Sequence, residues 1–193
     1  IASAIAGDIA EGPCLAAKDT VSMHGMKGKV EVRLGSGLKV LKAGEADCIA
    51  IAGMGASTMI EILEADMPLA VEAKRLVLQP MAGAASLRKW LIQNGCHIVA
   101  EDLVADGRHL YEIMAVERGE REAFSDAALE IGPSLIEAKH PLLAKQFARQ
   151  INNYKKLLAN MGKSEQARAS EKYIAWEKLV QELEALADAC NCK

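Results

Sequence analysis

The stretch Ile-Ala-Ile-Ala-Gly-Met-Gly at residues 49–55 decides the fold class of this chain. Its first four residues are apolar without alternation, which is typical of a strand covered on both faces of a parallel sheet. The glycines Gly53 and Gly55 then form a loop that lets a ligand approach the backbone closely. A second apolar run, at residues 5–9, contains a single carboxylate, Asp8, at its end. Together the two runs predict a cofactor crevice in an α/β sheet.

Strand-like and helix-like segments alternate through the first half of the chain. Apolar runs typical of strands lie at residues 4–9, 30–34, 48–52 and 76–78, and helical spacing occurs at residues 16–24, 59–65 and 87–94. This alternation predicts βαβ units in a doubly wound parallel sheet. After Gly95, two strand-like stretches at 97–104 and 110–116 flank Asp106-Gly107, which favours an antiparallel hairpin at the edge of the sheet.

The last third of the chain carries only helical spacing. Apolar residues recur every three or four positions in two series, interrupted by Asn160-Met161-Gly162: Leu143, Phe147, Ile151, Tyr154 and Leu158, then Tyr173, Trp176, Val180, Leu183, Ala187 and Cys190. Two such stripes predict an antiparallel, coiled-coil-like helical hairpin. Gly132-Pro133 marks a boundary, so we expect a Rossmann-like domain at 1–133 and a helical coiled-coil domain at 134–193.

Charge is distributed unevenly along the chain. The formal net charge is only −3, but residues 1–138 carry a net −7, residues 139–178 a net +6, and the remaining tail a net −2. The basic segment is either a solvated helix face or a site for a polyanion. The cations of this segment, among them Lys145, Arg149, Lys155 and Lys156, lie off the apolar stripes, so we expect them to be exposed on the helices.

Several classes of protein are excluded by composition. No apolar run approaches the roughly 20 residues that span a bilayer, and the first residues lack the pattern of a secretory signal, so a cytoplasmic location without membrane contact is expected. The five cysteines are odd in number and form no Cys-x-x-Cys pair, which argues against a disulfide framework. The histidines show no metal-ligand spacing, and no Gly-x-Ser-x-Gly elbow is present. We expect no metal site.

Three short motifs admit a cofactor role and a plain structural one. The carboxylate of Asp8 matches the two hydroxyls of a ribose, or it belongs to the turn before a helix that starts at Glu11-Gly12-Pro13. Gly35-Ser36-Gly37 suits a base edge or an ordinary turn. Gly53-x-Gly55 resembles a dinucleotide fingerprint, but the next strand ends in Leu78-Gln79-Pro80 rather than in an acid, which disfavours NAD.

A set of motifs in fixed order connects the chain with a known family. They are AIAGDI at 4–9, EGP at 11–13, VRLGSGL at 32–38, IAGMG at 51–55, LQP at 78–80 and YEI at 111–113. Together they resemble the bacterial tRNA adenine-22 N1-methyltransferases (TrmK-like) over nearly the whole chain. The resemblance implies a class I methyltransferase fold with a C-terminal coiled coil, S-adenosyl-L-methionine as cofactor and tRNA as substrate. With tRNA as the polyanion, we expect backbone contacts from Lys145, Arg149, Lys155 and Lys156. The family's cofactor loop, Asp-x-Gly-Ser-Asp-His-Ala-Tyr-Leu-Pro, would precede Ile1.

Site residues follow from the same resemblance. Cofactor binding is implied for Asp8, Ile9, Gly35, Ser36, Gly37, Ala52, Gly53 and Met54, whereas Gly55, Gln79 and Pro80 would border the target base. Three positions depart from the family's pattern. Ser36 stands where an aspartate is usual, Met81 replaces an asparagine, and Ala56 replaces a glycine.

The chemistry of the target explains why no catalytic residue is assigned. Adenine N1 has a free lone pair and no proton, so its attack on a sulfonium methyl group requires positioning rather than a general base. Two alternatives remain beside the enzyme: a non-catalytic RNA-binding or oligomerising module with a decayed cofactor site, and a small-molecule methyltransferase. Monomer and coiled-coil dimer are both compatible with the helical stripes.

Overall fold

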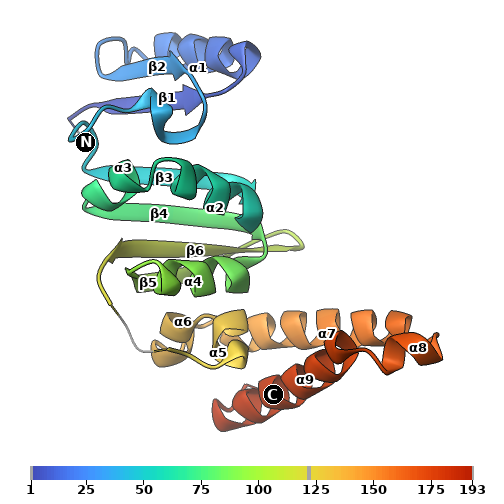
Figure 1. Cartoon of the computed structure of the whole chain (residues 1–193). Helices are drawn as coiled ribbons and strands as arrows, with labels where there is room; N and C mark the ends of the chain where they lie inside the picture. The colour runs from blue at the N-terminus through green and yellow to red at the C-terminus, as the bar shows by residue number, and fades with distance from the viewer. Residues whose placement is uncertain (1, 121–122, 193) are drawn as a thin grey trace.

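The computed structural model describes residues 2–120 and 123–192, as an α/β region followed by a helical region (Figure 1). Two separate sheets make up the α/β region. In the first, β1 (Ala4–Asp8) pairs in parallel with β2 (Val30–Leu34). The second has the strand order β3-β4-β6-β5. The predicted single sheet is therefore divided between β1 and β3, because no ladder hydrogen bonds join these two strands within the described residues.

The first sheet forms a small βαβ unit. Helix α1 (Glu11–Met23) starts at the predicted Glu11 and connects β1 to β2. Cys14 is its one buried residue, with Sγ 3.6 Å from the carbonyl oxygens of Asp8 and of Arg33. The unit leaves several large apolar side chains exposed: Ile9, Leu15, Met23, Met26 and Leu34. The unit buries little apolar surface within itself and depends on the rest of the molecule for packing.

The second sheet begins with two parallel strands. Strand β3 (Cys48–Gly55) leads directly into α2 (Ala56–Ala65), and α3 (Met67–Glu72) precedes β4 (Arg75–Ala82). The register pairs Cys48 with Arg75 and Ala52 with Gln79. Helix α4 (Ala84–Gln93) follows β4. The sequence analysis did not predict α3 or the 3-10 helix η1 (Gly37–Val40), because both are too short to show a helical period.

The predicted hairpin is confirmed at the edge of this sheet. Strands β5 (Cys96–Asp106) and β6 (His109–Arg118) pair antiparallel, and β6 pairs with β4. Asp106 lies opposite His109, so the turn is where Asp106-Gly107 predicted it. Strands β5 and β3 are the two edge strands of this sheet.

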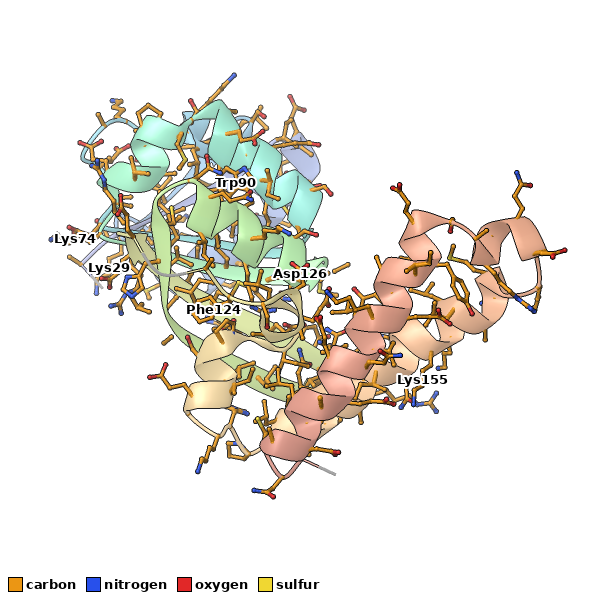
Figure 2. The ribbon with its side chains drawn as sticks, turned by 60° about the horizontal axis from the view of Figure 1, so that its bottom comes forward. Lys29, Lys74, Trp90, Phe124, Asp126 and Lys155 are labelled. Atoms are coloured by element: carbon orange, nitrogen blue, oxygen red, sulfur yellow. The ribbon has the colours of Figure 1, made fainter. Side chains whose placement is uncertain are left out.

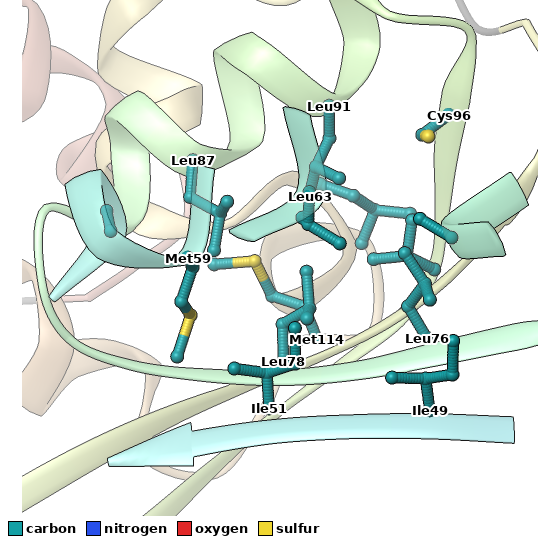
Figure 3. Close-up of a cluster of buried hydrophobic side chains, with 14 of the residues drawn as sticks. Ile49, Ile51, Met59, Leu63, Leu76, Leu78, Leu87, Leu91, Cys96 and Met114 are labelled. Atoms are coloured by element: carbon teal, nitrogen blue, oxygen red, sulfur yellow. The ribbon is translucent and has the colours of Figure 1, made fainter. Parts of the chain in front are cut away.

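The core of the α/β region lies between the second sheet and helices α2 and α4 (Figure 3). Met59 and Leu63 of α2, and Leu87 of α4, are fully buried against the sheet. Leu38 of η1 joins the same core although it follows the first sheet in sequence. Each of these aliphatic side chains contributes roughly 1.5–3 kcal/mol through burial. Leu38 thereby attaches the first βαβ unit to the second.

The helical region contains five helices within the described residues. They are α5 (Asp126–Ile131), α6 (Pro133–Glu137), α7 (Leu143–Met161), α8 (Glu165–Arg168) and α9 (Glu171–Ala189). Ser125, Ser164 and Ser170 accept hydrogen bonds from the backbone of the first turns of α5, α8 and α9, which explains where these helices start. Helices α7 and α9 pack against each other and project beyond the sheets (Figure 2).

A second core joins this region to the hairpin. Phe147 of α7 and Leu183 of α9 pack with Leu103 of β5 and Leu110 of β6. The predicted apolar stripes of the two long helices therefore face inward. Among the described residues, no helix combines the length and the apolar character that a bilayer crossing requires.

Candidate functional site

The parallel strands β1 to β4 all end on the same side of the molecule (Figure 1). Ligands of open α/β sheets bind beyond the carboxyl ends of the strands. Most of the cofactor and base residues implied by the sequence lie at these four ends. The four basic residues of α7 lie elsewhere, in the helical region.

Asp8 is the last residue of β1, and its carboxylate faces the turn into α1. Its Oδ1 accepts a hydrogen bond of 2.8 Å from the backbone N–H of Ala10. Oδ2 has no partner within the described part of the chain, and the next side chain, Ile9, is exposed. One oxygen thus fixes the carboxylate in the turn while the other remains an acceptor for a ligand hydroxyl.

Gly35, Ser36 and Gly37 connect β2 to η1 under the side chain of Val40. A Cβ on Gly35 would lie 2.8 Å from Val40 Cγ1, and one on Gly7 of β1 would lie 2.7 Å from Val40 Cγ2. Both glycines are required by this close approach. Ser36 is exposed, and its side chain makes no capping hydrogen bond at the start of η1.

Arg33 holds this connection in place, a role that sequence analysis missed. Its Nη1 donates to the carbonyl of Val40 at 2.7 Å and to Glu45 at 2.6 Å, and its Nη2 reaches Glu31 at 2.7 Å. The bonds from Arg33, with the backbone N–H of Lys42, lower the pKa of Glu45 to about 2. Arg33 thus links β2 to the end of η1. No sequence motif predicts this hydrogen bond.

The glycine-rich segment after residue 52 is a bulged strand end and not the predicted loop. Strand β3 continues to Gly55, with register shifts on both sides of Met54. Gly53 has a positive φ of 77°, which supplies the extra bend of a β-bulge. A Cβ added at Gly53 or at Gly55 would meet no atom within 4 Å, so open space lies above this backbone.

Gln79 and Pro80 lie opposite this bulge on β4. The backbone N–H of Gly53 donates to Gln79 Oε1 at 3.0 Å, and Gln79 Nε2 lies 3.6 Å from Met81 Sδ. Pro80 pairs with Met54, and both Met54 and Met81 are exposed. Gln79 therefore fixes the bulge, and the two methionines border it with apolar, adaptable side chains.

The basic residues of α7 are not equivalent. Lys145 and Lys156 are exposed, and Lys155 forms an ion pair of 2.6 Å with Glu184 of α9. Arg149 turns inward, where Nη1 donates to the carbonyl of Leu110 at 2.6 Å and Nη2 pairs with Glu112. The prediction that Arg149 lies on the exposed face is wrong, because the buried carboxylate of Glu112 on β6 attracts its guanidinium.

A buried ion network surrounds Glu112. Arg88 of α4 is completely buried and donates to Glu101 at 2.6 Å, to Glu112 at 2.7 Å and to the carbonyl of Leu129 at 2.7 Å. Burial by itself lowers the pKa of Arg88, but the charges of Glu101 and Glu112 outweigh it and raise that pKa. The network joins α4, the hairpin, α5 and α7 in one fixed arrangement.

Gly132 contacts the same network. A Cβ at this position would lie 3.0 Å from Arg88 Nη2 and 3.1 Å from Glu101 Oε1, and the backbone N–H of Ser134 donates to Glu101 at 2.9 Å. The Gly132-Pro133 pair is thus packed against the α/β region. In the described part of the chain, no group of three His, Cys, Asp or Glu side chains is arranged to hold a metal ion.

Comparison with known proteins gives consistent matches. The sequence profile of the family "TrmK: tRNA (adenine(22)-N(1))-methyltransferase" matches residues 1–184. A Bacillus subtilis protein named tRNA (adenine(22)-N(1))-methyltransferase is 36% identical over 155 residues, which cover 78% of this chain and 65% of that protein. The chain therefore matches less than two thirds of the length of this curated relative.

Solved structures support the same fold. A Streptococcus agalactiae protein of the NADB-Rossmann superfamily superposes with a TM-score of 0.85 at 31% identity, covering 96% of this chain and 80% of that one. A Streptococcus pneumoniae protein in complex with S-adenosyl-L-methionine superposes with a TM-score of 0.82 at 30% identity, over 96% and 81% of the two chains. The α/β region is therefore Rossmann-like.

Proposed function

The chain belongs to the tRNA (adenine(22)-N(1))-methyltransferase family, and from this premise we propose that it serves S-adenosyl-L-methionine-dependent methylation of adenine N1 at position 22 of tRNA. One observation carries the proposal beyond family membership. The implied cofactor and base residues come from four separate strand ends, and these ends lie on one side of the molecule. An RNA-modifying enzyme of bacteria acts in the cytoplasm, which is our expectation for this chain.

The strand ends fit the cofactor. The free acceptor of Asp8 suits a ribose hydroxyl, the exposed Ser36 and the neighbouring glycines suit the adenine edge, and the open bulge at Gly53 suits the amino-acid end. Ile9 and Ala52 flank these positions in the sequence. S-adenosyl-L-methionine, when bound, supplies an electrophilic methyl group on a sulfonium.

The chain's own contribution to the chemistry is placement. Gln79 holds the bulge at Gly53, so the backbone that borders both the cofactor and the target base has one defined conformation. The exposed Met54 and Met81 offer apolar surface to a base that has left its stack. Holding the reacting atoms in line at about 3–3.5 Å supplies roughly 7–11 kcal/mol of the barrier reduction. We assign no general base.

The helical region suits the tRNA. Lys145 and Lys156 are exposed on α7, where they neutralise backbone phosphates, whereas Lys155 already pairs with Glu184 of α9. We assign Arg149 a different role, which is to fix α7 on the hairpin through Glu112. Residues 134–193 then act as a helical domain in which α7 and α9 form a coiled-coil-like hairpin that carries the RNA contacts.

The direct test is methyl transfer to a tRNA transcript. Two versions are tested: the chain as printed, and the chain fused to the C-terminal end of the family's cofactor-loop segment. We expect a labelled methyl group to be transferred to a tRNA with adenine at position 22 and not to one with guanine there. The Asp8→Asn variant keeps the acceptor for Ala10 and loses the charge, so cofactor affinity should fall at least about tenfold. RNA binding without any methyl transfer in either version would contradict the enzyme and favour a non-catalytic module; methylation of free metabolites alone would indicate a small-molecule enzyme.

A further inference from the structure

Helix α8 and the turns beside it lie at the far end of the helical region, away from both sheets (Figure 1). A shallow basin lies there. It occupies about 520 Å³ between the last turn of α7, the short helix α8 and the start of α9, and we call it the tip basin. Its lining combines an apolar floor, one phenol ring and two cations: Leu158, Ala159, Gly162, Lys163, Arg168 and Tyr173. None of these residues belongs to the strand-end site.

Gly162 leaves room for the side chains that line the basin. A Cβ at this position would lie 3.1 Å from the carbonyl oxygen of Leu158, 3.6 Å from the Tyr173 hydroxyl and 3.7 Å from Arg168 Nε. The Tyr173 hydroxyl and the Arg168 guanidinium therefore both lie next to the backbone of Gly162, which carries no side chain. Any larger residue would fill the space between them.

Arg168 is held by one nitrogen and presents the others. Its Nε donates to the carbonyl of Gly162 at 2.6 Å, which fixes the plane of the guanidinium. Among the described residues, its Nη1 and Nη2 have no partner, so they remain donors in a fork that matches the oxygens of a phosphate. Lys163 adds a second exposed cation, with only a long 3.4 Å contact to Asn160.

The surroundings of the basin are basic and aromatic. The ammonium of Lys172 lies 4.7 Å from the centre of the Trp176 ring, and Tyr154 meets the same ring edge to face. Between residues 155 and 172 the chain has five cations and two acids, Glu165 and Glu171. In contrast, Arg149 and Lys155, which the sequence placed on the RNA-binding face, already have carboxylate partners in the fold.

We propose that the tip basin binds a nucleotide of the substrate RNA, with Lys163 and Arg168 on one backbone phosphate and the neighbouring base against the Tyr173 ring. An RNA is favoured over a protein segment because cations beside an aromatic face form the usual site for a phosphate and a stacked base. The inference rests on the proposed function, since it assigns a contact site for the same tRNA. Helix α7 is about 28 Å long, so this contact positions the RNA far from the reacting adenine.

The test uses fluorescence anisotropy of an unmodified tRNA transcript with the intact chain at several salt concentrations. The Lys163→Gln/Arg168→Gln variant should bind at least about tenfold more weakly, with a salt slope smaller by roughly 0.7–0.9, because the two cations together neutralise one phosphate. Tyr173→Leu should weaken binding about fivefold or more without a change of slope, and Tyr173→Phe should bind as wild type because the ring remains.

A matched control carries the same loss of charge elsewhere. Lys27 and Lys29 are exposed on the first βαβ unit, and the Lys27→Gln/Lys29→Gln variant should bind tRNA like wild type apart from a small general charge effect. If the tip variant and this control bind alike, or if wild type binds no RNA, the inference is wrong. If the tip variant alone is weakened while no version transfers methyl groups, the tip basin stands and the proposed activity falls.

Discussion

Arg88 and Glu112 form an ion pair in the interior, with Nη2 of the arginine 2.7 Å from Oε2 of the glutamate. The side chain of Arg88 is fully buried and that of Glu112 is 7% exposed. Glu112 also accepts a hydrogen bond from Arg149 on its other oxygen, so one carboxylate links α4, β6 and α7. The Tyr111-Glu112-Ile113 motif therefore has a structural explanation: its glutamate orients the helical region on the α/β region.

Removing Arg88 should destabilise the protein strongly. In Arg88→Met the shape is largely kept, but Glu101 and Glu112 are left as buried charges without their main partner, which costs about 3–5 kcal/mol. Urea unfolding followed by circular dichroism measures this loss. Arg75→Met is the matched control, since its pair with Glu117 is half exposed and contributes less than about 1 kcal/mol. Equal losses for the two variants would contradict a structural role of the buried network.

Glu130 should make the helical region sensitive to pH. Burial raises the pKa of this carboxyl, although the hydroxyl of Tyr154, 2.6 Å away, and Arg88 oppose the shift. Above about pH 4.5 the unfolded chain loses its proton first and binds fewer protons than the native state, so the free energy of unfolding falls until the raised native pKa is passed. Glu130→Gln keeps an acceptor for Tyr154 and removes this titration. We expect its stability relative to wild type to increase as the pH rises above about 4.5; parallel curves for the two proteins would refute this.

The sequence predicted those parts of the molecule that depend on local pattern. Strand β2 and the turn at Asp106-Gly107 have the predicted positions because alternation, apolar runs and turn residues act within a few positions. The stripes of α7 and α9 were equally readable, since each repeats over five or six apolar residues. The bulge at Gly53 was misread as a loop because a bulge and a turn both use a glycine with positive φ.

The pairings that sequence analysis missed join distant positions. Arg149 finds its partner 37 positions earlier, at Glu112, and Arg88 finds Leu129 across 41 positions. Among residues outside the apolar stripe of a helix, the spacing in the sequence is the same for a cation that turns inward and for one that faces solvent. The sequence analysis therefore placed Arg149 on the exposed face of α7. Only the packing of α7 on the β5–β6 hairpin shows that this side chain turns inward.

Gly35 should be essential for cofactor binding through Val40. In Gly35→Ala the new methyl group would lie 2.8 Å from Val40 Cγ1, and the β-branched side chain has few alternative rotamers, so η1 must shift away from β2. We expect S-adenosyl-L-methionine to bind at least about tenfold more weakly in calorimetric titration, equal to about 1.4 kcal/mol.

Two further variants separate this steric effect from a general loss of flexibility. Gly35→Ala/Val40→Ala removes the opposing methyl group and should recover most of the affinity. Gly12→Ala lies in α1, where a Cβ meets no atom within 4 Å, and should bind like wild type. Failure of the double variant to recover would mean that Gly35 acts through its backbone conformation and not through contact with Val40.

Leu38 should control how firmly the first βαβ unit is attached. This unit is a two-stranded sheet with one helix, a size that is marginal by itself, and five of its large apolar side chains are exposed. Leu38 is 4% exposed and is the residue of η1 that enters the core of the second sheet. Amide hydrogen exchange should therefore be faster in β1 and β2 than in β4 and β6. Leu38→Ala, which loses about 2–5 kcal/mol of packing, should accelerate exchange in β1 and β2 by at least about thirtyfold and leave β6 nearly unchanged. Equal acceleration in all four strands would show instead that the chain opens as one cooperative unit, with η1 no weaker than the rest of the core.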